Sequence, residues 1–158
     1  MNALQGASLI AATLAMGLMA GVFWIYGNAI MRGLRRTDDS TFVGAFQSID
    51  RAIINPSFMA TFFGALLLTG AAAGLNASEG DVLPWTLAAF VLYLAVVVIT
   101  IQVNVPRNDE IKAATDPDLT AVRQRFDEDR WVRWNTVRAA ASTAALACLA
   151  WALAEYVP

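Results

Sequence analysis

Residues 130–154 read RWVRWNTVRAAASTAALACLAWALA, a charged segment that turns into an apolar run. A helix from Trp134 to Tyr156 is long enough to cross a hydrocarbon core of about 30 Å. Polar and aromatic residues at its mouth are spaced i, i+3, i+4 and i+7 and therefore share one helical face. They are Trp131, Trp134, Asn135 and Arg138. Such a face either anchors the helix at lipid headgroups or lines a pocket.

The composition favours a membrane protein. Of 158 residues, 58% are hydrophobic and 15% are charged, which is too apolar for an ordinary soluble domain. The runs without Asp, Glu, Lys or Arg are residues 1–31, 52–78, 82–106 and 139–154. The sequence therefore predicts an all-α fold, an antiparallel four-helix transmembrane bundle that forms a single integral membrane domain. The predicted spans are about residues 7–28, 57–75, 82–104 and 134–156.

The basic residues predict the orientation of the bundle. They fall only between residues 32 and 51 and between residues 107 and 138. By the positive-inside rule both segments are cytoplasmic, so both termini face outward. All basic residues except Lys112 are Arg, and Ala is abundant, which suggests a GC-rich bacterial genome. We therefore expect a multi-pass protein of the bacterial cytoplasmic membrane whose first apolar run is a retained helix.

Further helices are predicted on the cytoplasmic side. Residues 38–40, DDS, are N-cap types before an amphipathic stretch, and Asn55 with Pro56 interrupts that stretch before span two. This pattern predicts an interfacial helix that kinks into the membrane. From Leu119 the sequence predicts a charged helix that continues without a breaker into span four, as a long cytoplasmic extension.

Amide and aromatic side chains gather at the cytoplasmic ends of the spans. An amide at this depth is costly unless it is hydrogen-bonded, so these residues either cap helices and bond between them or face a ligand together. With Arg138, the set predicts a pocket whose entrance is cytoplasmic. Its members are Asn28, Gln47, Asn55, Asn104, Asn108, Trp131, Trp134 and Asn135.

Metal chemistry through histidine is excluded because the chain contains no His. Imidazole-ligated haem, His-based zinc or iron centres and a His general base all require that side chain. The single cysteine, Cys148, has no partner for a disulfide and lies within the fourth span. We predict no metal site.

Several motifs resemble the anthrone oxygenase family, small four-helix membrane proteins also catalogued as a domain of unknown function. The resemblance covers nearly the whole chain, and its most specific element is N-V-P-x-N followed by W-x-x-W-N-x-x-R. The segments that carry it are GLMAGVFWIYGNAIMRGL at 17–34, FQSIDRAIINPSF at 46–58, VNVPRNDEI at 103–111 and the motif at 131–138. The family's motif positions fall on Gln47, Asn55, Pro56, Asn104, Pro106, Asn108, Trp131, Trp134, Asn135 and Arg138. Asp50 stands where the family pattern leads us to expect Asn.

The resemblance implies oxidation of an anthrone to an anthraquinone by molecular oxygen, without a cofactor. Deprotonating the anthrone methylene gives an enolate that can pass an electron to oxygen. The site then needs a flat apolar slot, a donor to the enolate oxygen and a base. We predict catalytic roles for Asp50 as base, Arg138 at the oxyanion or superoxide, and Asn104, Asn108 and Asn135 as donors. Substrate binding is predicted for Trp24, Asn28, Gln47, Asn55, Trp131 and Trp134.

Other function classes stay open. The protein is alternatively a non-enzymatic subunit, or a partner of a larger complex that binds lipid or a hydrophobic ligand. A small transporter is the weakest alternative because the spans lack an intramembrane charge. Arg138 is alternatively paired with Asp50 or Asp127. The expected partners are membrane lipid, a hydrophobic aromatic small molecule and, in a homo-oligomer, other copies of the chain; no nucleic acid is expected.

Overall fold

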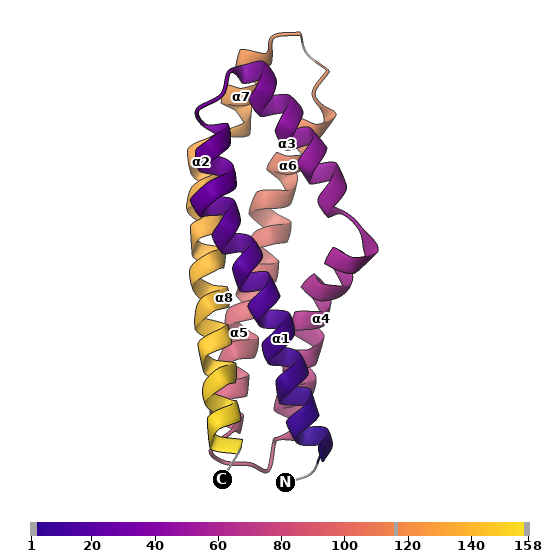
Figure 1. Cartoon of the computed structure of the whole chain (residues 1–158), viewed down its shortest axis with the longest axis vertical. Coiled ribbons are helices and arrows are strands. Elements are labelled where there is room, and N and C mark those ends of the chain that lie inside the picture. Colours follow the sequence, from indigo (N-terminus) through magenta and orange to yellow (C-terminus); the bar gives the residue numbers. More distant parts are fainter. Residues whose placement is uncertain (1–2, 116, 157–158) are drawn as a thin grey trace.

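Helices and their connecting loops make up the described part of the protein (Figure 1). The computed structural model describes residues 3–115 and 117–156. The α-helices are α1 (Ala3–Ile25), α2 (Met31–Leu34), α3 (Asp39–Ile53), α4 (Pro56–Leu75), α5 (Leu83–Ile99), α6 (Val105–Ala113), α7 (Leu119–Phe126) and α8 (Glu128–Tyr156). Two π-helical segments, η1 (Tyr26–Ile30) and η2 (Thr100–Asn104), continue α1 and α5.

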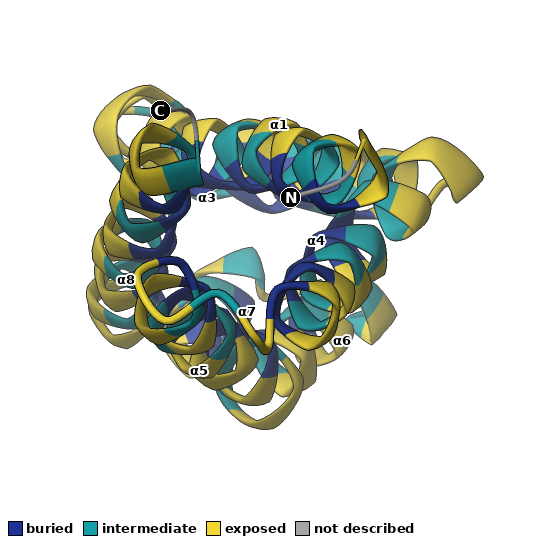
Figure 2. Cartoon of the chain, turned by 90° about the horizontal axis from the view of Figure 1, so that it is seen from below, coloured by how far each residue is buried: buried dark blue, intermediate teal, exposed yellow. Residues whose placement is uncertain are grey.

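Four helical stretches are long and apolar enough to cross a membrane, as the sequence predicts. They are Ala3–Leu34, Pro56–Leu75, Leu83–Ala113 and Leu119–Tyr156. Helix α1 packs against α4 and α8, and α5 packs against the same two helices. The four therefore form a ring in which each helix runs antiparallel to its two neighbours (Figures 1 and 2).

The inside of the ring combines small alanine side chains with larger apolar and aromatic ones. Figure 2 shows buried residues facing the axis of the bundle and exposed residues on its outer surface. Ala12, Ala65, Ala89 and Ala145 are fully buried, one on each helix of the ring. Small side chains at these positions let the helices approach closely. The outer surface, in contrast, is covered by large apolar side chains such as Leu67, which is 70% exposed.

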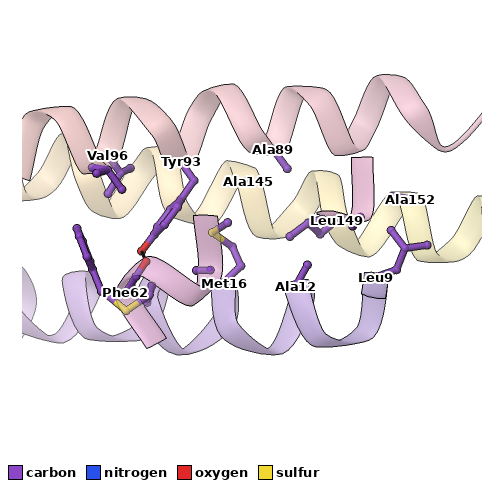
Figure 3. Packing of buried hydrophobic residues seen from close by; sticks show 14 of the residues in the cluster. Leu9, Ala12, Met16, Phe62, Ala89, Tyr93, Val96, Ala145, Leu149 and Ala152 are labelled. Atoms are coloured by element: carbon purple, nitrogen blue, oxygen red, sulfur yellow. Dashed lines mark hydrogen bonds between the residues drawn. The ribbon is translucent and has the colours of Figure 1, made fainter. Parts of the chain in front are cut away.

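Tyr93 brings a polar group into this apolar core. It is completely buried on α5, and its hydroxyl donates a hydrogen bond to the Phe62 carbonyl oxygen on α4 over 3.1 Å (Figure 3). A buried hydroxyl without a partner would cost a desolvation penalty of about 1–3 kcal/mol. The bond therefore satisfies Tyr93 and fixes α4 against α5 at the level of Phe62.

A second apolar cluster closes one end of the ring, opposite the two termini (Figure 1). Helices α3, α6 and α7 pack against one another there. Arg123 ties α7 to α3 through Asp39 at 3.0 Å and to α8 through Glu128 at 3.3 Å. Hydrogen bonds from Thr120 and then Arg123 lower the pKa of Asp39 below its ordinary value. We call the buried residues Met31, Phe42, Val43, Phe46, Ile111, Val122, Phe126 and Trp131 the cap cluster.

The predicted continuous helix from Leu119 into the fourth span is wrong. Helix α7 ends at Phe126, and Asp127 adopts a left-handed conformation with φ 53° before α8 begins at Glu128. Asp tolerates this conformation better than most residues and is also a favoured N-cap. Its carboxylate accepts a hydrogen bond from the Arg130 amide over 3.3 Å. The break lets α7 fold back over α3 and complete the cap cluster.

Replacing Asn55 by Ala should lower the free energy of unfolding by about 1 kcal/mol, the usual value of an N-cap. Asn55 accepts a hydrogen bond from the Phe58 amide at 3.0 Å and donates one to the Ala52 carbonyl at 2.9 Å. It therefore joins the end of α3 to the start of α4. Denaturant unfolding in detergent measures the effect, with Asn55→Asp as the control that keeps the acceptor. Equal stability of Asn55→Ala and the wild type would contradict this role.

Candidate active site

A cavity of about 290 Å³ lies between the core of the ring and the cap cluster. Phe62 borders it on the side of the core, and Phe46 and Trp131 border it on the side of the cap. Its volume is at the lower end of the range for small-molecule pockets, about 300–1,000 Å³. Most of the wall is apolar. The predicted site residues that the structure brings to this wall are Asp50, Asn108, Trp131, Asn135 and Arg138.

Arg138 provides a buried positive charge at the cavity wall, with 5% of the residue exposed. It donates from Nη2 to Asn135 Oδ1 at 2.9 Å and from Nη1 to Thr100 Oγ1 at 3.2 Å. Within residues 3–115 and 117–156 it forms no ion pair, and its Nε has no hydrogen-bond partner. The alternative that Arg138 is paired with Asp50 or Asp127 is therefore wrong.

Two aromatic rings flank this guanidinium. Arg138 Cζ lies 4.6 Å from the centroid of the Phe23 ring and 5.5 Å from that of Trp131. Cation–π contacts and neutral hydrogen bonds replace only part of the hydration that a buried cation loses. The guanidinium is therefore well placed to bind an anionic oxygen inside the cavity, because such a partner would compensate the remaining cost.

Asp50 supplies a carboxylate to the same cavity and is 6% exposed. Its two oxygens accept hydrogen bonds from Asn108 Nδ2 at 2.7 Å and from Lys112 Nζ at 3.0 Å. Asn108 Oδ1 in turn accepts from the indole Nε1 of Trp131 at 2.7 Å. Because Lys112 also pairs with the exposed Asp109 at 2.8 Å, this network reaches from the cavity wall to the surface.

The two π-helical segments lie beside the cavity and place side chains in its wall. A π turn is wider than an α turn and is frequent at functional sites. The first segment presents Tyr26, whose ring lies 6.0 Å from that of Trp131. The second begins with Thr100, which holds Arg138. The widened turns therefore help to orient the Tyr26 side chain and the Thr100 hydroxyl at the cavity wall.

Gly27, in the first π segment, allows Asn135 to come close to α1. A Cβ atom at Gly27 would lie 3.2 Å from Asn135 Nδ2. That amide nitrogen donates to the Phe23 carbonyl oxygen over 2.9 Å, while Oδ1 of the same side chain accepts from Arg138. Asn135 therefore fixes the guanidinium of Arg138 relative to the backbone of α1.

Three predicted residues lie outside the wall of the cavity. Asn104 is buried; its Nδ2 donates to the Trp131 carbonyl at 3.5 Å, and its Oδ1 has no partner in the described chain. Gln47 donates to the Ile111 carbonyl at 2.8 Å and so joins α3 to α6. Trp134 is partly buried. None of the three is among the described residues that line the cavity.

The structure places the last three predicted residues elsewhere. Trp24 and Asn28 line a separate groove of about 770 Å³ between α1 and α8. Trp24 is 57% exposed, and Asn28 donates to the Trp24 carbonyl oxygen at 3.1 Å. Asn55 is the exposed N-cap of α4. These side chains are therefore not brought together with Arg138.

Sequence reasoning missed a large part of the wall. The aromatic residues lie inside continuous apolar runs, where no local signal separates a cavity residue from a core residue. Lys112 did carry a signal, since it is the single lysine of the chain and lies i+4 from Asn108 on one helical face. The missed residues include Phe23, Tyr26, Phe46, Phe62, Thr100 and Lys112.

Residues 53–148 match the anthrone oxygenase family. No curated protein and no solved structure shows a significant match to the chain. The matched range covers more than half of the sequence and includes Asn108, Trp131, Asn135 and Arg138, whereas Asp50 lies just outside it. The extent of this match and the four packed apolar helices lead to one conclusion: the chain belongs to the anthrone oxygenase family.

Proposed function

We propose that this protein is a membrane-embedded oxygenase that oxidises an anthrone-type or related aromatic substrate with molecular oxygen and without a cofactor. One observation carries the proposal: a buried cation, Arg138, and a buried carboxylate, Asp50, share the wall of one apolar cavity. Proton removal next to a carbonyl group needs a base and a partner for the negative oxygen that results. Family membership supports the choice of substrate class.

The outer surface of the ring supports a membrane location. Leu14, Leu67 and Val91, on three different helices, are 65%, 70% and 62% exposed. Large apolar surfaces of this kind are unfavourable in water and favourable against lipid chains. The basic residues lie toward the cap cluster, so we assign that end to the cytoplasm and both termini to the outside of a bacterial cytoplasmic membrane.

The first step uses the two charged groups of the wall. Asp50 takes a proton from the methylene carbon, and the electron pair of that C–H bond moves to the carbonyl oxygen of the anthrone. Arg138 stabilises the resulting enolate oxygen, a task for which Asn135 and Thr100 hold its guanidinium in place. Trp131 and the apolar wall keep water away, which strengthens this electrostatic interaction.

The remaining steps consume one molecule of oxygen. The enolate passes one electron to O₂, and the carbon radical combines with superoxide to form a peroxide, which takes the proton held by Asp50. Asp50 then removes the second methylene proton while the O–O bond breaks, so that a carbonyl group forms and hydroxide leaves. Hydroxide takes the proton from Asp50. One anthrone and one O₂ therefore give one anthraquinone and one water.

The direct test is oxygen uptake by purified protein with several anthrones in detergent or nanodiscs. We expect anthraquinone to form with one O₂ consumed per anthrone, faster than in matched samples of the folded Arg138→Met variant. This variant controls for spontaneous oxidation in the same detergent. A rate equal to the spontaneous one for every anthrone tested would refute the proposed activity.

Gly27→Ala should lower the rate of oxidation by about tenfold to a hundredfold, the loss typical of a small misplacement of a catalytic group. The added methyl group presses on Asn135, which then shifts Arg138. Steady-state kinetics measure the effect. The matched control is Gly21→Ala, where no atom lies within 4 Å of the added Cβ. A normal rate in Gly27→Ala would show that Asn135 does not position the guanidinium.

A second candidate function is binding of a membrane lipid without catalysis. The observation that favours it is the groove between α1 and α8, which Trp24 and Asn28 line together with the exposed Arg32. An acyl chain would lie against the small residues of α8, and an anionic headgroup would lie near Arg32. Native mass spectrometry would support this function if a stoichiometric lipid were retained and were lost in Arg32→Ala, with no anthrone turnover.

A further inference from the structure

The cap cluster closes the cavity along the axis of the bundle. It lies between the cavity and the end of the bundle opposite the termini, and its aromatic rings pack closely. The Phe46 and Phe126 centroids are 4.6 Å apart, and Phe46 meets Trp131 edge to face at 5.9 Å. Both phenylalanines and the indole are almost completely buried. An entrance through the centre of the cap cluster would therefore require these rings to separate.

The side of the bundle, in contrast, is open at the corner between α3 and α4. Ile54, Phe63 and Ile101 line the cavity, yet they are 58%, 41% and 54% exposed. A residue that is both at the cavity wall and at the molecular surface marks an opening. Ile54 lies at the corner, Phe63 lies on α4 and Ile101 lies on η2, so the opening lies between these segments.

The backbone explains why this corner is open. Helix α3 packs mainly against α6 and α7 in the cap, whereas α4 packs mainly against α1 and α5 in the ring. Ile54 and Asn55 connect these two sets, and the corner projects from the body of the molecule (Figure 1). The Asn55 cap and Pro56 stop the helix at this point. The chain therefore leaves the helices of the cap at this corner before it joins the helices of the ring.

The rim of the opening is apolar on the side of the ring and charged on the side of the cap. On the side of the cap, the polar residues Asp109 and Lys112 also border the cavity, with Asp109 60% exposed. This change from apolar to charged surface is the pattern expected at the boundary between lipid chains and headgroups. An opening edged by isoleucine and phenylalanine just below that boundary faces lipid chains, where an uncharged polycyclic aromatic compound dissolves better than in water.

We propose that the substrate reaches the cavity sideways from the lipid phase, through the opening edged by Ile54, Phe63 and Ile101. This inference rests on the proposed membrane location and function. The substrate would then pass its apolar rings over the isoleucines and turn its carbonyl toward Arg138. The cap cluster would meanwhile keep water from the enolate. The protein would select substrates by their solubility in lipid before it selects them by contact.

A thiol-labelling experiment tests the opening without any substrate. Thr100→Cys in a Cys148→Ser background places a sulfur where the Thr100 hydroxyl lies 3.2 Å from Arg138. The guanidinium favours the thiolate, which is the reactive form. In nanodiscs, N-phenylmaleimide, which is uncharged and soluble in lipid, should label this cysteine. Adding Ile54→Trp or Ile101→Trp should slow labelling by about tenfold, a barrier change of about 1.4 kcal/mol.

The control substitutions enlarge apolar residues on the same surface but away from the opening. Leu67→Trp on α4 and Val91→Trp on α5 should leave the labelling rate within about twofold of the parent. Equal slowing by these controls, or no slowing by Ile54→Trp and Ile101→Trp, would overturn the proposal. Faster labelling by a charged, water-soluble maleimide than by N-phenylmaleimide, with each rate divided by that reagent's rate on the unfolded protein, would overturn it too, because the path would then be aqueous.

A second reporter guards against misfolding of the first. If Thr100→Cys does not fold, Val22→Cys on α1, which also lines the cavity, replaces it with the same expectations. The outcome is separate from that of the proposed function, since labelling needs no anthrone. Slowed labelling in a protein that oxidises no anthrone would keep the lateral opening and reject the oxygenase. Oxidation of anthrones, together with labelling that Ile54→Trp and Ile101→Trp leave unaltered, would keep the oxygenase and reject the lateral opening.

Discussion

Replacing Arg138 by Met should lower the rate of anthrone oxidation by about a hundredfold to a thousandfold, the loss typical of removing one oxyanion donor. The same variant should remain folded and keep most of its thermal stability. Burial of a charged group costs several kcal/mol, whereas the Asn135 oxygen left without its donor costs about 1–3 kcal/mol. Oxygen uptake and thermal unfolding, measured on one preparation, give both results.

The matched control is Arg133→Met. Arg133 lies on the same helix but is exposed, so its loss should change neither the rate nor the stability by much. The opposite pattern for Arg138→Met, a large loss of stability with a normal rate in the folded fraction, would assign the guanidinium to structure. The combination of kept stability and lost rate is what separates a ligand-binding charge from a packing residue.

Asp50→Asn should lower the rate constant for turnover by about a hundredfold to ten-thousandfold, which is the usual contribution of a positioned base. The amide has nearly the same shape as the carboxylate, so the cavity keeps its form, but it cannot accept the methylene proton. Substrate affinity should change much less than turnover. Steady-state kinetics resolve the two quantities, and binding of the anthraquinone product, followed by tryptophan quenching, checks the affinity separately.

Asp129→Asn is the control for Asp50→Asn. Asp129 is another carboxylate in an ion pair, with Arg35, but it is 89% exposed and is not among the described residues that line the cavity. Its replacement should leave turnover near the wild-type value. A wild-type rate in Asp50→Asn would reject Asp50 as the base and would return its carboxylate to the task of holding Asn108 and Lys112. Asp50→Asn also introduces the residue that the family pattern leads us to expect at this position, so the same variant tests the effect of that departure.

The sequence predicted the spans because charge is excluded from long runs, and this signal does not depend on tertiary contacts. The helical spacing also predicts that Trp131, Asn135 and Arg138 share one face of α8. At about 100° per residue, Asn135 and Arg138 lie about 40° and 20° from Trp131, whereas Trp134 lies about 60° away. The structure accordingly puts the first three residues at the cavity wall and Trp134 outside it.

The rest of the site depends on features that leave little trace in a sequence. The π turns are single-residue changes in helical winding. The sequences of η1, YGNAI, and of η2, TIQVN, contain no pattern that predicts them. The break at Asp127 lacks the Gly or Pro that usually marks one. Phe23 and Phe62 become wall residues only because the cap closes above them. Such positions are set by packing between distant segments, which a single sequence does not display.

The buried charge of Arg138 also links folding to ligand binding. The folded protein bears a desolvation cost that an acidic or enolisable ligand would relieve, while the unfolded chain bears no such cost. A ligand at a hundred times its dissociation constant adds about 2.7 kcal/mol to the stability of the folded state. A rise in melting temperature should therefore identify, in a collection of aromatic carbon acids, the compounds that bind at Arg138.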